Sequence, residues 1–204
     1  MLDKLTWLGH ASFRIDGQKR VYIDPWKISA GPAADLVLVS HSHYDHYSQE
    51  DIDKISGPNT VLVTVKEVAD KAGGNVEIVE PGDTTEVLGI KIEAPPAYNI
   101  SKQFHPKANG WIGFVVEMGG KRLYYAGDTD IVPEMRDLLN IDVALLPVGG
   151  TYTMNANEAA EAAKIIKPGV AVPYHWGDIV GSANDAQRFA RMYGGKVEIL
   201  KAVG

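Results

Sequence analysis

Residues 36–46 read Leu-Val-Leu-Val-Ser-His-Ser-His-Tyr-Asp-His. The four apolar residues that open the stretch have the length and composition of a strand buried on both faces, so the polar residues follow at its carboxyl end. Residues two apart in an extended chain point the same way, which lets His41 and His43 bind one metal ion together. Asp45 and His46 can then turn toward a second ion beside it.

Four potential ligands within six residues need polar partners if they are buried, and a metal would supply them. The alternative is a solvated loop that is rich in histidine by chance. The chain contains no cysteine, so a thiolate site, a disulfide and a cysteine nucleophile are excluded. Any metal must therefore be held by nitrogen and oxygen atoms.

Short strands and helices are predicted on both sides of this stretch. Residues 5–23 form an antiparallel opening, and Thr64 with Glu67 has the capping-box pattern that begins a helix. A polar loop is predicted for 99–110, and a last strand for 196–200. Both halves share an order of hairpins followed by strand–helix units. We therefore predict an α/β (α+β) protein with a single domain over 1–204.

Composition narrows the class of protein further. With 204 residues and 45% hydrophobic content the chain can bury a core, and its net charge of −6 argues against long DNA or RNA as a partner. The N-terminus lacks a signal pattern, and no segment approaches the roughly 20 apolar residues that a membrane span needs. We expect a cytoplasmic protein with a small-molecule substrate; its oligomeric state stays open.

The motif His-x-His-x-Asp-His after a buried strand resembles the signature of the metallo-β-lactamase superfamily. Residues 7–12, Trp-Leu-Gly-His-Ala-Ser, and 22–26, Tyr-Ile-Asp-Pro-Trp, look like the opening of the branch with ascorbate-6-phosphate lactonase-like and N-acylphosphatidylethanolamine phospholipase D-like proteins. Residues 125–129, Tyr-Ala-Gly-Asp-Thr, are similar to the strand end whose Asp bridges two metals. This resemblance implies that Asp128 is a bridging ligand, although Gly-Asp-Thr is also a common turn.

The resemblance also implies ligands from two later segments. Val-Pro-Tyr-His at 172–175 is similar to the strand that delivers the last histidine ligand, here His175. The third histidine of the first metal usually follows a strand end like Ala94–Tyr98, where this chain has Asn99 instead. We choose His105, the nearest histidine, for that position; in the alternative His105 is a surface residue, and Asn99 or water completes the coordination.

Two further residues are candidates for the surroundings of the metals. His10 follows Gly9 at an expected strand break and would line the pocket, or else be a hydrogen-bonded structural histidine. Asp24 could accept a hydrogen bond from a ligand imidazole and fix its tautomer, or it could belong to a strand-end turn.

The resemblance implies a four-layer αββα sandwich, in which two mixed β-sheets carry helices on both outer faces and the site lies at one edge. It further implies a metal-dependent hydrolase with one or two ions, in which metal-bound hydroxide attacks and Asp45 orients it and moves its proton. Zn²⁺ suits the ligands, with Mn²⁺ or Fe as alternatives. The expected substrate is a small ester, lactone or phosphodiester. The alternatives are an iron-dependent redox protein, similar to persulfide dioxygenases, and a metal-binding protein without turnover.

Overall fold

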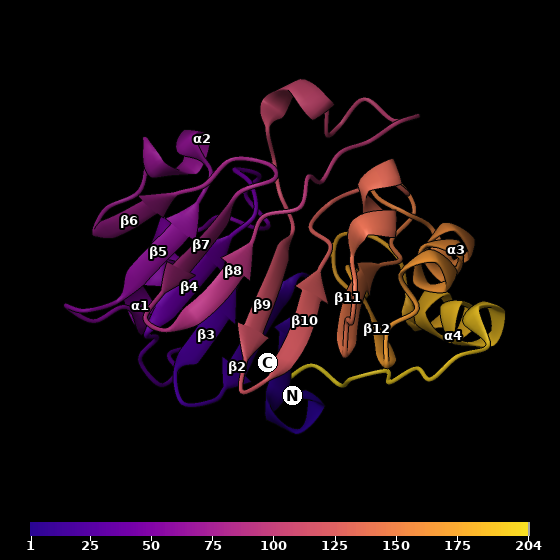
Figure 1. Cartoon of the computed structure of the whole chain (residues 1–204), viewed down its shortest axis with the longest axis horizontal. Helices are drawn as coiled ribbons and strands as arrows, with labels where there is room; N and C mark the ends of the chain where they lie inside the picture. Colours follow the sequence, from indigo (N-terminus) through magenta and orange to yellow (C-terminus); the bar gives the residue numbers. More distant parts are fainter. Residues whose placement is uncertain (204) are drawn as a thin grey trace.

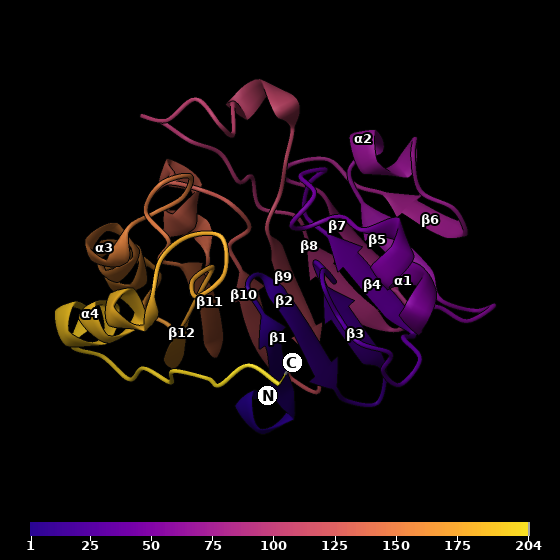
Figure 2. The ribbon, with the colours of Figure 1, turned by 180° about the vertical axis from the view of Figure 1, so that it is seen from behind.

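Two six-stranded β-sheets pack face to face, as Figures 1 and 2 show from opposite sides. The computed structural model describes residues 1–203. The first sheet has the order β1-β2-β3-β4-β5-β6, and the second has the order β12-β11-β10-β9-β8-β7. The strands of the first sheet are β1 Leu5–Gly9, β2 Ser12–Asp16, β3 Arg20–Ile23, β4 Leu36–Val39, β5 Val61–Thr64 and β6 Asn75–Ile78. Those of the second are β7 Thr84–Val87, β8 Ile90–Glu93, β9 Phe114–Met118, β10 Lys121–Tyr125, β11 Val143–Pro147 and β12 Val170–Tyr174.

Each sheet begins with antiparallel strands and continues with parallel ones. In the first sheet β1, β2 and β3 are antiparallel neighbours, whereas β3 to β6 run parallel. In the second, β7 to β10 are antiparallel, and β10, β11 and β12 are parallel. The two halves of the chain therefore repeat one topology, and the parallel strands of each sheet end at a common edge.

Helices cover the outer faces of the two sheets, which confirms the predicted αββα sandwich. The α-helices are α1 Gln49–Ile55, α2 Lys66–Ala69, α3 Ala156–Ile166 and α4 Ala183–Tyr193, and the 3₁₀ helices are η1 Leu2–Lys4, η2 Lys107–Asn109 and η3 Pro133–Asp137. Figures 1 and 2 show α1 and α2 beside the first sheet and α3 and α4 beside the second. In the described part of the chain, no helix has both the length and the apolar character needed to cross a membrane.

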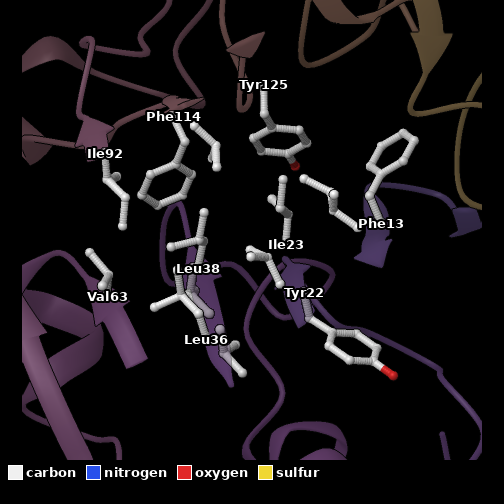
Figure 3. Close-up of a cluster of buried hydrophobic side chains, with 14 of the residues drawn as sticks. Phe13, Tyr22, Ile23, Leu36, Leu38, Val63, Ile92, Phe114 and Tyr125 are labelled. Atoms are coloured by element: carbon white, nitrogen blue, oxygen red, sulfur yellow. The ribbon is translucent and has the colours of Figure 1, made fainter. Parts of the chain in front are cut away.

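The main hydrophobic core lies between the sheets. Figure 3 shows Ile92, Phe114 and Tyr125 of the second sheet facing Leu38 and neighbouring side chains of the first, and all of these are buried. Successive side chains of a strand point to opposite faces, so β4 buries one face toward the other sheet and its second face on the outer side of its own sheet. The full burial of β4 agrees with its continuous apolar sequence.

Two expectations about local structure are wrong. Thr64 does not cap a helix; its hydroxyl donates to the carbonyl of Val39 at 2.8 Å, and α2 is a single turn without a side-chain cap. Residues 196–200 form no strand and make only an isolated bridge, from Val197 to Ala171. The predicted 99–110 loop is confirmed, with η2 as its one short turn of helix.

Candidate metal centre

The six histidines of the chain gather where strand ends from both sheets meet. They lie on the loops that follow β1, β4, β8 and β12, and Asp128 lies on the loop that follows β10. The loop between β8 and β9, which carries His105, rises above the sheets in Figure 1. Ends of parallel strands are where ligand sites form in open sheets, and here two sheets contribute to one site.

A first cluster consists of three imidazoles. One ring nitrogen from each of His41, His43 and His105 lies within 4.8 Å of the others. Nε2 of His41 and Nδ1 of His43 are 3.2 Å apart. The indole of Trp111 packs against all three rings, with centroids 4.7 to 5.5 Å away. The side of these imidazoles that faces Trp111 is thereby closed off by an apolar wall.

A second cluster lies beside it and contains His10, Asp45, His46 and His175, again with donor atoms within 4.8 Å of one another. Oδ2 of Asp45 lies 2.9 Å from Nε2 of His10 and 3.7 Å from Nε2 of both His46 and His175. The sequence motif predicted that Asp45 and His46 turn away from His41 and His43, and this arrangement agrees with that prediction.

Asp128 lies between the two clusters. Its Oδ2 is 3.3 Å from Nε2 of His105 and 3.2 Å from Nε2 of His175, while its Oδ1 is 3.2 Å from Nε2 of His46. Gly127 holds the preceding turn at φ 66°, where a Cβ would come within 2.7 Å of a backbone oxygen. The sharp turn after β10 therefore needs glycine, and it aims the carboxylate into the centre.

The buried donor atoms of this centre point at a common space and do not satisfy one another. Within residues 1–203, Nε2 of His46, His105 and His175 and Oδ1 of Asp128 have no hydrogen-bond partner. Leaving such atoms unsatisfied costs about 1–3 kcal/mol each, which a native protein accepts when another group completes them. Nitrogen and carboxylate donors converging in this way fit Zn²⁺, and they also fit Mn²⁺ or Fe.

Asp24 holds two of these imidazoles from behind, one directly and one through Ser40. Its Oδ2 accepts hydrogen bonds from Nδ1 of His46 at 2.7 Å, from the hydroxyl of Ser40 at 2.5 Å and from the hydroxyl of Tyr125 at 2.6 Å. Oγ of Ser40 in turn lies 2.9 Å from Nδ1 of His41. A proton on Nδ1 of both imidazoles leaves Nε2 free to bind an ion. Asp24 thus supports one histidine in each cluster.

Asn99 has a similar place behind His105. Its Oδ1 lies 3.0 Å from Nδ1 of His105 and accepts a hydrogen bond from the backbone N–H of His105, also at 3.0 Å. Its Nδ2 donates to Oδ1 of Asp130 at 3.2 Å and to the carbonyl of Tyr152 at 3.0 Å. Of the two candidates for the third position of the first cluster, this geometry favours His105, with Asn99 orienting its ring.

The protonation preferences of the buried groups follow from burial and from the charges that face one another in the centre. Burial, followed by the charge of His46, keeps the pKa of His41 well below its usual value, so this imidazole is neutral. Burial by itself would raise the pKa of Asp128, but the neighbouring His175 and His46 outweigh it and lower the pKa well below normal. Burial would lower the pKa of His46 and His175, but the charge of Asp128 outweighs it and raises the pKa of both. Metals coordinate neutral imidazole and ionised carboxylate, so an ion bound here would displace the protons of these two rings.

A cavity of about 210 Å³ opens above the two clusters. Its floor is formed by the clusters and its rim by apolar side chains from four loops. The lining residues are His43, Tyr44, Asp45, Phe104, His105, Asp128, Tyr152, His175 and Ile179. A small molecule in this cavity would contact Asp45 and Asp128 directly.

Sequence reasoning missed several residues that position the ligands. Ser40 and Tyr125 bind Asp24, and Tyr125 is 101 positions away from it in the chain. Glu67, taken as part of a helix cap, accepts hydrogen bonds from Ser42 at 2.6 Å and from the indole of Trp111 at 3.0 Å. Among these residues, only Ser40 could have been identified from the sequence, because it directly precedes the histidine motif.

Comparison with known proteins agrees with this description. Residues 4–175 match the model of a family described as the β-lactamase superfamily domain. A relative from Thermococcus onnurineus, named UPF0173 metal-dependent hydrolase, is 36% identical over 97% of this chain and 95% of its own length. A structure from Parabacteroides distasonis, provisionally named a metal-dependent hydrolase, has a TM-score of 0.87 at 32% identity and covers 97% of this chain and 92% of that one.

A further solved structure extends the comparison to a hyperthermophile. Igni18, a metallo hydrolase from Ignicoccus hospitalis, is 25% identical with a TM-score of 0.78, over 97% of this chain and 94% of its own. The curated relatives, at about 35% identity, confirm the prediction that the protein is an enzyme of the metal-dependent hydrolase type. The matched family, the αββα sandwich and the histidine motif agree, and the chain belongs to the metallo-β-lactamase superfamily.

Proposed function

We propose that the protein is a binuclear, zinc-dependent hydrolase of small esters, lactones or phosphodiesters. The observation that carries the proposal is the pair of donor clusters with Asp128 between them and with unpartnered nitrogen and oxygen atoms facing inward. The first ion would be held by His41, His43 and His105. The second would be held by Asp45, His46 and His175, and Asp128 would bind both.

Bound divalent ions supply a nucleophilic hydroxide at neutral pH and polarise the scissile bond. The residues of this chain would do the rest of the chemistry. Asp45 borders the cavity, and its carboxylate can accept the proton of the attacking water and return it to the leaving group. The hydrogen bond of 2.9 Å from Nε2 of His10 to Oδ2 of Asp45 holds this carboxylate in place. His10 is thus a positioning residue.

Elemental analysis of the purified protein, together with hydrolysis of a lactone, an aryl ester and an aryl phosphodiester, tests this proposal. We expect about two equivalents of zinc and turnover that stops with a chelator and returns with Zn²⁺. If Mn²⁺ rather than Zn²⁺ restores turnover, the metal in the proposal changes and the proposed reaction stays the same. Stoichiometric iron without hydrolysis would contradict the proposal in favour of a redox protein, and bound metal without any turnover would favour a binding protein.

Asp45→Asn separates catalysis from metal binding at this site. The amide cannot take up a proton, but its oxygen can still face an ion. We expect turnover to fall by about 10²–10⁴-fold, the usual contribution of a general base, while the protein keeps at least the ion of the first cluster. Metal content and kcat measured on the same preparation check this, and unchanged kcat would remove Asp45 from the reaction.

A further inference from the structure

The rim of the metal cavity is apolar and exposed. Tyr44, Phe104, Tyr152 and Ile179 line it and form what we term the apolar collar. Tyr44, Phe104 and Ile179 are 66%, 47% and 37% exposed, which places them among the exposed large apolar residues of the described chain. Water-exposed apolar side chains that converge on one opening are typical of a binding site.

The collar is assembled from four separate loops. Tyr44 comes from the histidine loop after β4, Phe104 from the 99–110 loop, Tyr152 from the loop after β11 and Ile179 from the loop after β12. Phe104 and Tyr152 pack edge to face, with ring centroids 4.7 Å apart. Each of these loops except the one after β11 also carries a residue of the metal clusters. The collar is therefore fixed in position relative to the proposed ions.

No lysine or arginine of residues 1–203 lines this opening. The nearest candidates by sequence are already paired: Lys102 binds Asp130, Lys107 contacts Glu134 at 3.0 Å, and Lys27 contacts Asp178 at 3.0 Å. Enzymes that act on phosphoryl groups commonly add Arg or Lys clamps to their metals. Apart from the metals, the described part of the chain offers an anionic substrate no lysine or arginine at this site, and the net charge of −6 does not attract one.

From the collar and the missing cations, we infer that the site takes uncharged carboxylic esters or lactones with a short apolar group, which the collar binds next to the scissile carbonyl. This inference rests on the proposed function and selects among its three bond types. The small cavity, about 210 Å³ against roughly 300–1,000 Å³ for typical ligand pockets, limits the group that enters. Phosphodiesters and esters with anionic acyl chains are poor substrates.

Three chromogenic substrates with a common leaving group test the inference on zinc-loaded protein: 4-nitrophenyl butyrate, the 4-nitrophenyl monoester of succinate and bis(4-nitrophenyl) phosphate. We expect kcat/KM for the butyrate to exceed that for the succinate by about tenfold or more, since both acyl chains have four carbons and one ends in a carboxylate. A preference for the succinate or for the phosphodiester would overturn the inference. It would not contradict the proposal that the protein hydrolyses its substrate with bound metal.

Two substitutions at one position sharpen the test. Phe104→Ala should lower kcat/KM for the butyrate by about tenfold, and Phe104→Lys should move the preference toward the succinate. Leu139→Ala is the matched control, because Leu139 is 65% exposed and does not line the cavity. Equal effects of Phe104→Ala and Leu139→Ala would contradict the role of the collar.

Calorimetric titration with 4-phenyl-2-butanone, an unreactive uncharged ketone, separates the two proposals because it needs no turnover. We expect the zinc-loaded protein and its Leu139→Ala variant to bind the ketone with equal affinity, and Phe104→Ala to bind it about tenfold more weakly. If no ester is hydrolysed but this pattern holds, the hydrolase proposal fails and the inferred binding role of the apolar collar is supported. Identical affinities in all three proteins would contradict that binding role.

Discussion

At the scale of single residues, Asp24 connects parts of the centre that are far apart in the chain. Its carboxylate accepts from the backbone N–H and the hydroxyl of Ser40, from His46 and from Tyr125, and it is fully buried. It also holds a left-handed backbone with φ of 43°, which a non-glycine residue adopts at a cost. Local strain of this kind is common where surrounding structure fixes a functional group.

Asp24→Asn should lower zinc affinity without removing a ligand. An amide accepts fewer hydrogen bonds than a carboxylate and leaves the ring of His46 less firmly oriented, and loss of such a partner typically costs 10–100-fold in metal affinity. Competition with a chromophoric chelator measures the change. Asp142→Asn is the control, because Asp142 pairs with Lys121 and the N–H of Arg122 at the start of β10, the opposite end of this strand from Asp128. Equal zinc affinity in both variants would refute the role given to Asp24.

Residue types and their spacing predicted much of the candidate site. The histidine motif after β4 indicated two groups of ligands, and the structure brings His41 and His43 together and places Asp45 with His46. Tyr125 could not be found in this way, because nothing in its neighbourhood distinguishes it from a core residue of β10. Its hydroxyl acquires a function only when the two sheets pack.

At the scale of elements, the apolar run over 36–39 located β4 fully. The short β6 has no such pattern, because its residues are largely exposed. The helix cap expected at Thr64 failed because the strand β5 continues through that residue, and its hydroxyl binds the neighbouring strand. Local patterns lose predictive value where tertiary contacts decide the partner of a side chain.

The hairpin between β7 and β8 offers a test of backbone strain. Leu88 and Gly89 form its two-residue turn, with φ of 55° and 77°, and Leu88 is 43% exposed. Asn adopts this left-handed conformation more readily than Leu, and Asn-Gly is the preferred pair for such turns. Leu88→Asn should therefore raise the free energy of unfolding by about 0.5–1 kcal/mol.

Urea denaturation of Leu88→Asn, Gly89→Ala and the unmodified protein checks this. The midpoint should rise in the first variant and fall in the second, since alanine at positive φ is strained. A lower midpoint for Leu88→Asn would show that contacts of the leucine side chain outweigh the strain of its backbone.

At the scale of the whole molecule, the centre ties the two sheets together. Ligand candidates come from loops of the first sheet, such as His46, and from loops of the second, such as Asp128 and His175. Bound ions would therefore link the sheets at one edge, in addition to the core between them. The single domain over 1–204 and the cytoplasmic location stay predictions.

Removal of metal should lower thermal stability. A ligand that binds only the native state at 100 times its Kd adds about 2.7 kcal/mol, which corresponds to roughly 5–10 °C in Tm for a chain of this size. Scanning calorimetry with and without a chelator measures the shift, and Asp128→Ala should show a much smaller one. A chelator effect of equal size in both proteins would place the stabilising metal elsewhere.

The central claim is that two donor clusters, joined by Asp128, form one binuclear centre. Anomalous diffraction at the zinc edge from crystals of the zinc-loaded protein tests it most directly. We predict two peaks about 3.5–4 Å apart, one among His41, His43 and His105 and the other among Asp45, His46 and His175, with Asp128 between them. No peak at these residues, or a single peak without contact to Asp128, would contradict the account.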